Sequence, residues 1–138
     1  MAGELTLRVI TPEKIALDTV ADSVRIPAVD GSMGVLKRHA PMVAALDAGL
    51  LRYKSGGQET VMFVSGGFAE VRANTVRVVT EAGEDVAAID VERALAAEKR
   101  ARERLSIRQS AGGDPVDLLR AEASLRRAVM RIRAKRGA

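Results

Sequence analysis

His39 is the only histidine of the sequence, and the sequence contains no cysteine. It follows Lys37-Arg38 and precedes Ala40-Pro41, and no Ser, Asp or Glu lies near it in an arrangement that would orient the ring as a general base. The absence of cysteine excludes a disulfide scaffold, a thiolate zinc site and a cysteine nucleophile. We therefore expect a structural or interface role for His39 rather than a catalytic one.

A glycine-rich segment, Ser65-Gly66-Gly67-Phe68, follows the apolar run 61–64. A phosphate-binding P-loop needs Gly-Lys-Ser/Thr at the start of a helix, and the residues after Phe68 have strand character instead. The pattern favours a tight hairpin or a bulge in which glycine supplies a positive φ.

Several arginines near the C-terminus recur at helical spacings. Arg93 follows Asp90 by three residues and precedes Arg100 by seven, while Arg127 and Arg131 are four apart. If two helices placed these faces together, they would offer several guanidiniums and a carboxylate at one point. Guanidiniums suit phosphate oxygens, and a carboxylate accepts from a ribose hydroxyl or an adenine amine. The alternative is a set of ordinary surface ion pairs.

The charge distribution divides the 138 residues near residue 86. Residues 1–88 hold 9 basic and 11 acidic side chains, whereas residues 89–138 hold 13 and 7. The basic part has acids at helical spacing, as in Glu98/Arg102 and Glu122/Arg126, which is typical of solvated helices with ion pairs. Aromatic residues are 2% of the chain, so stacking platforms for single-stranded nucleic acids are missing. No apolar run is long enough to span a membrane, and we expect a soluble, unexported protein.

The first part of the chain reads as short strands. Leu5, Leu7 and Val9 alternate with polar residues, which predicts one buried face. Further runs cover residues 15–20, 24–26, 34–36, 42–45, 50–53, 60–64, 68–72 and 75–80. Turn signals separate them, at Val29-Asp30-Gly31, Asp47-Ala48-Gly49, Ser55-Gly56-Gly57, Ser65-Gly66-Gly67 and Ala73-Asn74. The pattern predicts an antiparallel sandwich or barrel, and we favour a β-sandwich of about ten strands over residues 1–86.

Residues 87–138 predict an antiparallel αα-hairpin, so the fold class is α+β. Strong helix formers fill residues 89–109, Gly112-Gly113 stops that helix, and Asp114 caps a second helix that has Pro115 at its first position and runs to about Lys135. The predicted apolar positions are few and rich in alanine, namely Ala94, Leu95, Ala97, Ala101, Leu105, Leu118, Leu119, Leu125, Val129 and Ile132. Such thin surfaces bury little area, so we expect the hairpin to have more than one resting place.

Three segments in this order resemble the epsilon subunit of the F-type ATP synthase. They are Gly34-Val35-Leu36 through His39-Ala40-Pro41, Ser65-Gly66-Gly67-Phe68-Ala69-Glu70-Val71, and Ile89-Asp90-Val91-Glu92-Arg93-Ala94. The resemblance implies a non-catalytic rotor subunit whose sandwich binds the gamma subunit and the ring of c subunits. It also implies a movable hairpin that inhibits ATP hydrolysis by contacting the alpha and beta subunits, at the cytoplasmic face of a bacterial plasma membrane or the stromal or cytoplasmic face of a photosynthetic one.

The resemblance also assigns residues to these roles. It places the ring contact at Ser32, Met33 and His39, with Lys37-Arg38 where many members have Pro-Gly or Pro-Asn. The inhibitory basic helix would use Arg120, Arg126, Arg127, Arg131 and Arg133. No cofactor is required, but ATP, with or without Mg²⁺, is the expected regulatory ligand, held by Glu84, Ile89, Asp90, Arg93, Ala94, Arg100, Arg127 and Arg131. Nucleic acid is not an expected partner. The alternative that the residues alone leave open is a basic helical adaptor for nucleic acid or an acidic protein.

Overall fold

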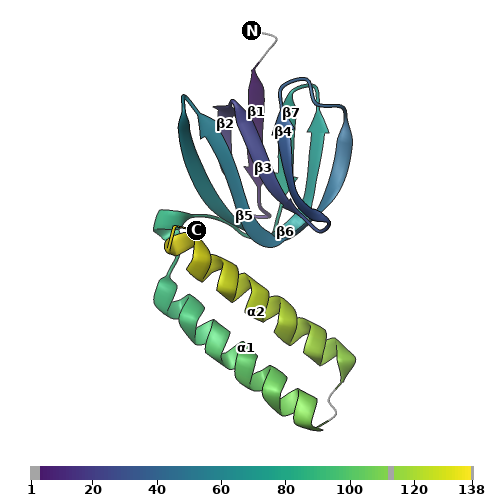
Figure 1. The fold of residues 1–138 in the computed structure, drawn as a ribbon, viewed down its shortest axis with the longest axis vertical. Coiled ribbons are helices and arrows are strands. Elements are labelled where there is room, and N and C mark those ends of the chain that lie inside the picture. The colour runs from purple at the N-terminus through teal and green to yellow at the C-terminus, as the bar shows by residue number, and fades with distance from the viewer. Residues whose placement is uncertain (1–3, 112–113, 138) are drawn as a thin grey trace. The chain divides into compact units, whose positions relative to one another are not determined.

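The computed structural model describes residues 4–111 and 114–137 and separates into two compact units, residues 1–85 and residues 86–138. The first unit is built of strands and the second of helices (Figure 1). The fold is therefore the predicted β-sandwich followed by a two-helix hairpin.

Eight strands form the first unit over its described residues, 4–85. They are β1 (Leu5–Ile10), β2 (Ile15–Ala21), β3 (Ser23–Ala28), β4 (Gly31–Leu36), β5 (Met42–Ser55), β6 (Gln58–Arg72), β7 (Thr75–Val79) and β8 (Gly83–Asp85). Their order along the sheet is β2-β1-β7-β6-β5-β3-β4, with β8 on β6. All pairs are antiparallel except β1 with β7.

Two long strands belong to both layers of the sandwich. The first half of β5 pairs with the second half of β6 beside β7, β1 and β2. The second half of β5 pairs with the first half of β6, next to β3 and β4 on one side and β8 on the other. One hairpin thus runs through the whole sandwich.

This continuity corrects two predicted turns. Asp47-Ala48-Gly49 and Ser65-Gly66-Gly67 lie inside β5 and β6, because Leu46 pairs with Gly67 and Ala48 with Ser65 in one unbroken register. The predicted runs 42–45 and 50–53 are therefore one strand, as are 60–64 and 68–72, and the predicted count of about ten strands was too high for the described residues.

The glycines at this crossing do have the predicted positive φ, 118° at Gly66 and 100° at Gly67. At Gly67 an added Cβ would overlap the carbonyl oxygen of Val79, so the neighbouring strand approaches too closely for a side chain. Beside it, the Ser65 hydroxyl accepts from the Ala82 amide at 2.9 Å and lies 3.2 Å from the Thr80 hydroxyl. The segment is a structural crossing between the layers.

The core follows the predicted alternation. Leu5, Leu7 and Val9 are fully buried and pack with side chains from both layers, among them Val24, Ile26, Leu51, Val64 and Val78. Burying such side chains contributes about 1.5–3 kcal/mol each and accounts for most of the driving force of this unit.

The second unit contains a short 3₁₀ turn (Val86–Ala88) and helices α1 (Val91–Ala111) and α2 (Pro115–Lys135). Helix α2 begins as predicted, since the Asp114 carboxylate accepts from the Val116 amide at 2.8 Å and Pro115 follows. Helix α1 starts two residues later than expected, and the Gly112-Gly113 stop lies outside the described residues. The predicted Glu98–Arg102 ion pair is present at 3.6 Å.

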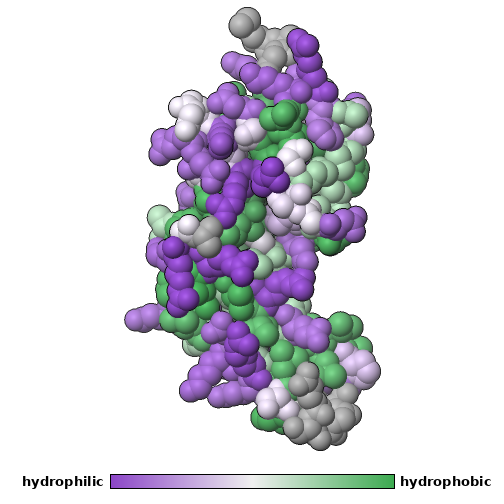
Figure 2. Space-filling model, viewed as in Figure 1, coloured by the Kyte–Doolittle hydropathy of each residue, from purple (hydrophilic) through white to green (hydrophobic). Residues whose placement is uncertain are grey.

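Alanines dominate the buried face of the hairpin, with Ala94, Ala101, Ala121, Ala128 and Ile132 almost fully covered. The prediction is wrong for two residues of this face, because Leu95 is 41% and Leu119 is 64% exposed. Hydrophilic side chains cover much of the hairpin, with hydrophobic groups visible between them (Figure 2).

Candidate functional site

An apolar row crosses the outer face of the five-stranded layer. The register joins Ala45 to Phe68, Phe68 to Val79, Val79 to Ile10 and Ile10 to Ile15. Phe68 is 43% and Ile15 58% exposed, which is unusual for large apolar side chains on a small sheet. Val43, which is 68% exposed and opposite Glu70, lies two residues before Ala45 on the same side of β5. This row together with Val43 (the apolar face) has the composition of a protein interface.

A second row beside it is charged. The register places Glu70 opposite Arg77 and Arg77 opposite Arg8, and Arg8 is 3.4 Å from Asp18. Charges bordering an apolar patch are typical of a rim that orients a partner.

The three residues expected to contact the ring of c subunits lie near opposite ends of β4. Ser32 and Met33 belong to its first half, where Ser32 accepts from Arg25 at 3.3 Å and Met33 packs against the core. His39 comes after the strand, half-buried, with its Nδ1 donating to the carbonyl of Ala40 at 2.8 Å. The structure therefore does not gather them into one cluster.

The segment between β4 and β5 has an unusual backbone at Arg38, whose φ is 64°. The Asn74 side chain accepts from the Arg38 amide at 2.7 Å and holds this conformation. Left-handed backbone is where glycine and asparagine are favoured, so this segment holds Arg38 in a conformation that its side chain disfavours.

Half of the residues expected to bind ATP also have structural contacts at the start of α1. Asp90 caps the helix, since its Oδ1 accepts from the Arg93 amide at 3.1 Å. Ile89 and Ala94 are 4% and 3% exposed and pack in the interior. Of these four residues, only Asp90 and Arg93 are exposed.

Helical geometry places the remaining arginines of this set on one side of the hairpin. An α-helix turns by about 100° per residue, so Arg93 and Arg100 both lie to one side of the buried alanines of α1. Arg127 and Arg131 are rotated in the same direction from the buried alanines of α2. In an antiparallel pair, equal displacements lie on the same side. Arg93 and Arg100 form no ion pair with any described residue, whereas Arg127 donates to Ser124 at 3.1 Å.

Glu84, the last residue of this set, belongs to β8 and pairs with Phe63 in the first unit. Glu84 itself is half-buried. It is thus held by the sheet, while the arginines are held by the helices.

The five arginines expected in the inhibitory helix occupy two faces of α2. By the same geometry Arg120, Arg127 and Arg131 lie on one side of its buried stripe, and Arg126 and Arg133 on the other. Arg133 borders a shallow hollow whose other lining residues are Glu98, Val129, Ile132 and Arg136.

Two kinds of feature, a metal-ligand cluster and a membrane-spanning helix, are absent from the described residues. No group of three or more potential ligands is placed to hold a metal ion. No helix there combines the length and the apolar character that crossing a bilayer requires.

The apolar face was not found from the sequence. Its members come from five strands and are adjacent only through the register, so no local motif marks them. The signal that remains is the alternation after Gly67, which puts Phe68 on the face opposite to buried Ala69.

Comparison with known proteins accounts for both units. Residues 4–86 match the family model described as the ATP synthase delta/epsilon chain β-sandwich domain, and residues 88–136 match its long α-helix domain. The ATP synthase epsilon chain of Symbiobacterium thermophilum is 49% identical over 96% of this chain and 93% of its own, and that of Desulfitobacterium hafniense is 40% identical over 99% of both.

A solved structure agrees. A chain of the Euglena gracilis mitochondrial ATP synthase, determined with its F1 part and c-ring, superposes with a TM-score of 0.77 at 25% identity over 92% of this chain and 78% of its own.

A sandwich followed by a helical hairpin, matched in both parts, defines the class: the chain belongs to the ATP synthase delta/epsilon family. It is an epsilon-type subunit of the central stalk of an F-type ATP synthase, a non-catalytic part of that complex. This replaces the alternative of a separate basic adaptor.

Proposed function

We propose that this chain couples a ring of c subunits to a gamma subunit during ATP synthesis, and that its hairpin restrains ATP hydrolysis. The observation that carries the coupling role is the apolar face, which leaves Phe68, Val43 and Ile15 exposed on one side of the five-stranded layer with a charged rim. Burying these side chains against gamma would stabilise the pair without any catalytic group.

The ring contact is assigned to the ends of β4. Exposed Ser32 near its start and half-buried His39 after its end offer polar groups, and Met33 supplies an apolar one. Because these residues are spread along the strand, the ring would meet a strip rather than a point.

Regulation is assigned to the hairpin. Its buried stripe consists mainly of alanine, so little free energy opposes its rearrangement. In an extended state, the two arginine faces of α2 would meet acidic surfaces of the alpha and beta subunits.

ATP is the proposed ligand of the folded hairpin. Arg93 and Arg100, free of ion pairs among the described residues, lie on the same side as Arg127 and Arg131, and guanidiniums suit a triphosphate. A ligand that binds only the folded state shifts the balance toward it, so high ATP would favour the permissive form.

The two epsilon chains named above come from bacteria, which supports a location at the cytoplasmic face of a bacterial plasma membrane, peripheral to it.

The coupling role is tested by co-purification of the full chain with the gamma subunit of the same organism. We expect Phe68→Glu to weaken the complex about tenfold or more, because the substitution places an unpaired charge in the interface. Leu36→Glu is the matched control, since Leu36 is also a large exposed apolar residue and lies on the other layer. Equal binding by both variants and the parent, with unchanged circular dichroism, would refute the assignment of the apolar face.

A further inference from the structure

Strand β4 is a free edge of the sheet. It pairs with β3, and no other strand of the described residues pairs with it. A free edge offers backbone N–H and C=O groups to a second extended chain.

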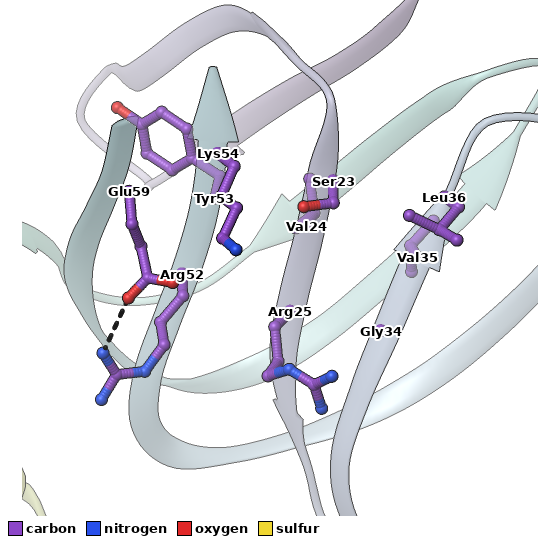
Figure 3. A pocket seen from close by; sticks show the side chains of 10 residues that line it. All are labelled: Ser23, Val24, Arg25, Gly34, Val35, Leu36, Arg52, Tyr53, Lys54 and Glu59. Carbon is purple, nitrogen blue, oxygen red and sulfur yellow. Dashed lines mark hydrogen bonds and ion pairs between the residues drawn. The ribbon is translucent and has the colours of Figure 1, made fainter. Parts of the chain in front are cut away.

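The side chain of Arg25 lies across this edge strand. Arg25 pairs with Gly34 in the register, and its Nη1 donates to the Ser32 hydroxyl at 3.3 Å. A Cβ at Gly34 would come within 3.5 Å of the Arg25 guanidinium, and Figure 3 shows that group extending from β3 toward Gly34. Because Gly34 has no side chain, the guanidinium can be reached from outside the sheet.

The surrounding charge is positive. Arg25, Arg52, Lys54 and a single acid, Glu59, line a hollow of about 350 Å³ on this face. Glu59 is engaged with Arg52 at 3.3 Å. Arg25 and Lys54 form no ion pair with any described residue, so their positive charges would attract an anion to this hollow.

Leu36 adds an apolar position to the same strip. It lies two residues after Gly34 on the same side of β4 and is 64% exposed. A strand added to β4 would therefore place one outward side chain against Leu36 and the next one toward Arg25.

We propose that the β4 edge is a docking site for an extended protein segment in which an acidic residue and an apolar residue are two positions apart and so point to the same face. The acidic side chain passes over Gly34 to Arg25, an apolar side chain packs on Leu36, and the backbone pairs with β4. This site is on the other layer from the apolar face, and the inference does not depend on the proposed gamma contact. A phospholipid headgroup would use the cations but not the backbone edge or its spacing, which favours the peptide.

The test uses the full chain labelled with ¹⁵N and a short synthetic peptide in which Glu and Val are two positions apart, with Thr at the positions between them. We expect the peptide to shift the amide signals of β4 and to bind more weakly as salt rises. Arg25→Glu should weaken binding about tenfold or more, because a charge-assisted hydrogen bond is replaced by repulsion. Gly34→Val should weaken binding similarly, because the added side chain blocks access to the Arg25 guanidinium. The fold should accept this substitution, since Gly34 is not in the left-handed region and an added Cβ would meet no backbone atom.

Lys14→Glu, an equal change of charge in the turn between β1 and β2, is the control and should leave binding unchanged. Equal binding of a peptide with Lys in place of Glu would overturn the proposal. So would binding to phosphatidylglycerol vesicles without binding to the peptide, or peptide shifts that persist in both Arg25→Glu and Gly34→Val.

Discussion

Single residues of this chain hold backbone conformations that their side chains disfavour. Arg38 has a φ of 64° and is kept there by the Asn74 side chain at 2.7 Å. A non-glycine residue in left-handed backbone costs about 1–2 kcal/mol, and glycine loses about 0.5–1 kcal/mol more entropy on folding. Arg38 donates this hydrogen bond with its backbone amide, so the bond survives any substitution of Arg38 except proline.

We therefore predict that Arg38→Gly raises the free energy of unfolding by about 0.5–1 kcal/mol. Lys37→Gly, next to it but not in left-handed backbone, should lower it by a similar amount. Urea denaturation of both variants measures the difference, and a loss of stability in Arg38→Gly would contradict the strain at this position.

At the scale of elements, α1 depends on its cap. The Asp90 carboxylate accepts the Arg93 amide at 3.1 Å, and the Asp90 carbonyl accepts the Ala94 amide at 3.0 Å. The same residue was expected to bind ATP, so its two roles need separation.

Asp90→Ala should destabilise the hairpin by about 0.5–2 kcal/mol, whereas Asp90→Asn should cost little because asparagine caps equally well. Helical circular dichroism during thermal unfolding gives the first comparison. If ATP contacts the Asp90 carboxylate, Asp90→Asn should keep the cap but lose affinity for ATP in a titration. An equal loss of helix in both variants would show that the Asp90 cap does not stabilise α1.

The elements also show what the sequence could and could not predict. The Asp114 cap, the Leu5-Leu7-Val9 alternation and the Ala73-Asn74 turn depend on neighbours in the chain, and all three were confirmed. Ser65-Gly66-Gly67 resembles a turn equally well, because a glycine pair permits either a reversal or a crossing. What decides is the pairing of Gly67 with Leu46 and its approach to Val79, which are distant in sequence. The apolar face escaped prediction for the same reason.

For the whole molecule, the arginines of the hairpin predict a response to nucleotide. We expect Mg-ATP to bind the full chain more tightly than Mg-ADP in isothermal titration, and to raise the melting temperature of the hairpin. At a hundredfold excess over Kd the stabilisation is about 2.7 kcal/mol.

Arg93→Ala and Arg127→Ala should abolish this heat of binding. Arg102→Ala is the matched control, because Arg102 is ion-paired with Glu98 and lies on the opposite side of the buried stripe from Arg93 and Arg100. Unchanged affinity in Arg93→Ala would rule out the site, and regulation would then rest on the arginines of α2 alone.

The hairpin of β5 and β6 has a mechanical consequence. Its pairs on both sides of Asp47 and Gly66 share one register, from Met42 with Val71 to Ser55 with Gln58, through both layers of the sandwich. Two sheets joined only by side-chain packing can slide past each other, but here sliding would require two strands that run through both layers to shear. A torque applied to one layer is therefore transmitted to the other along a single stiff ribbon. For a component of a rotating stalk, that makes the sandwich a rigid coupling with little elastic lag.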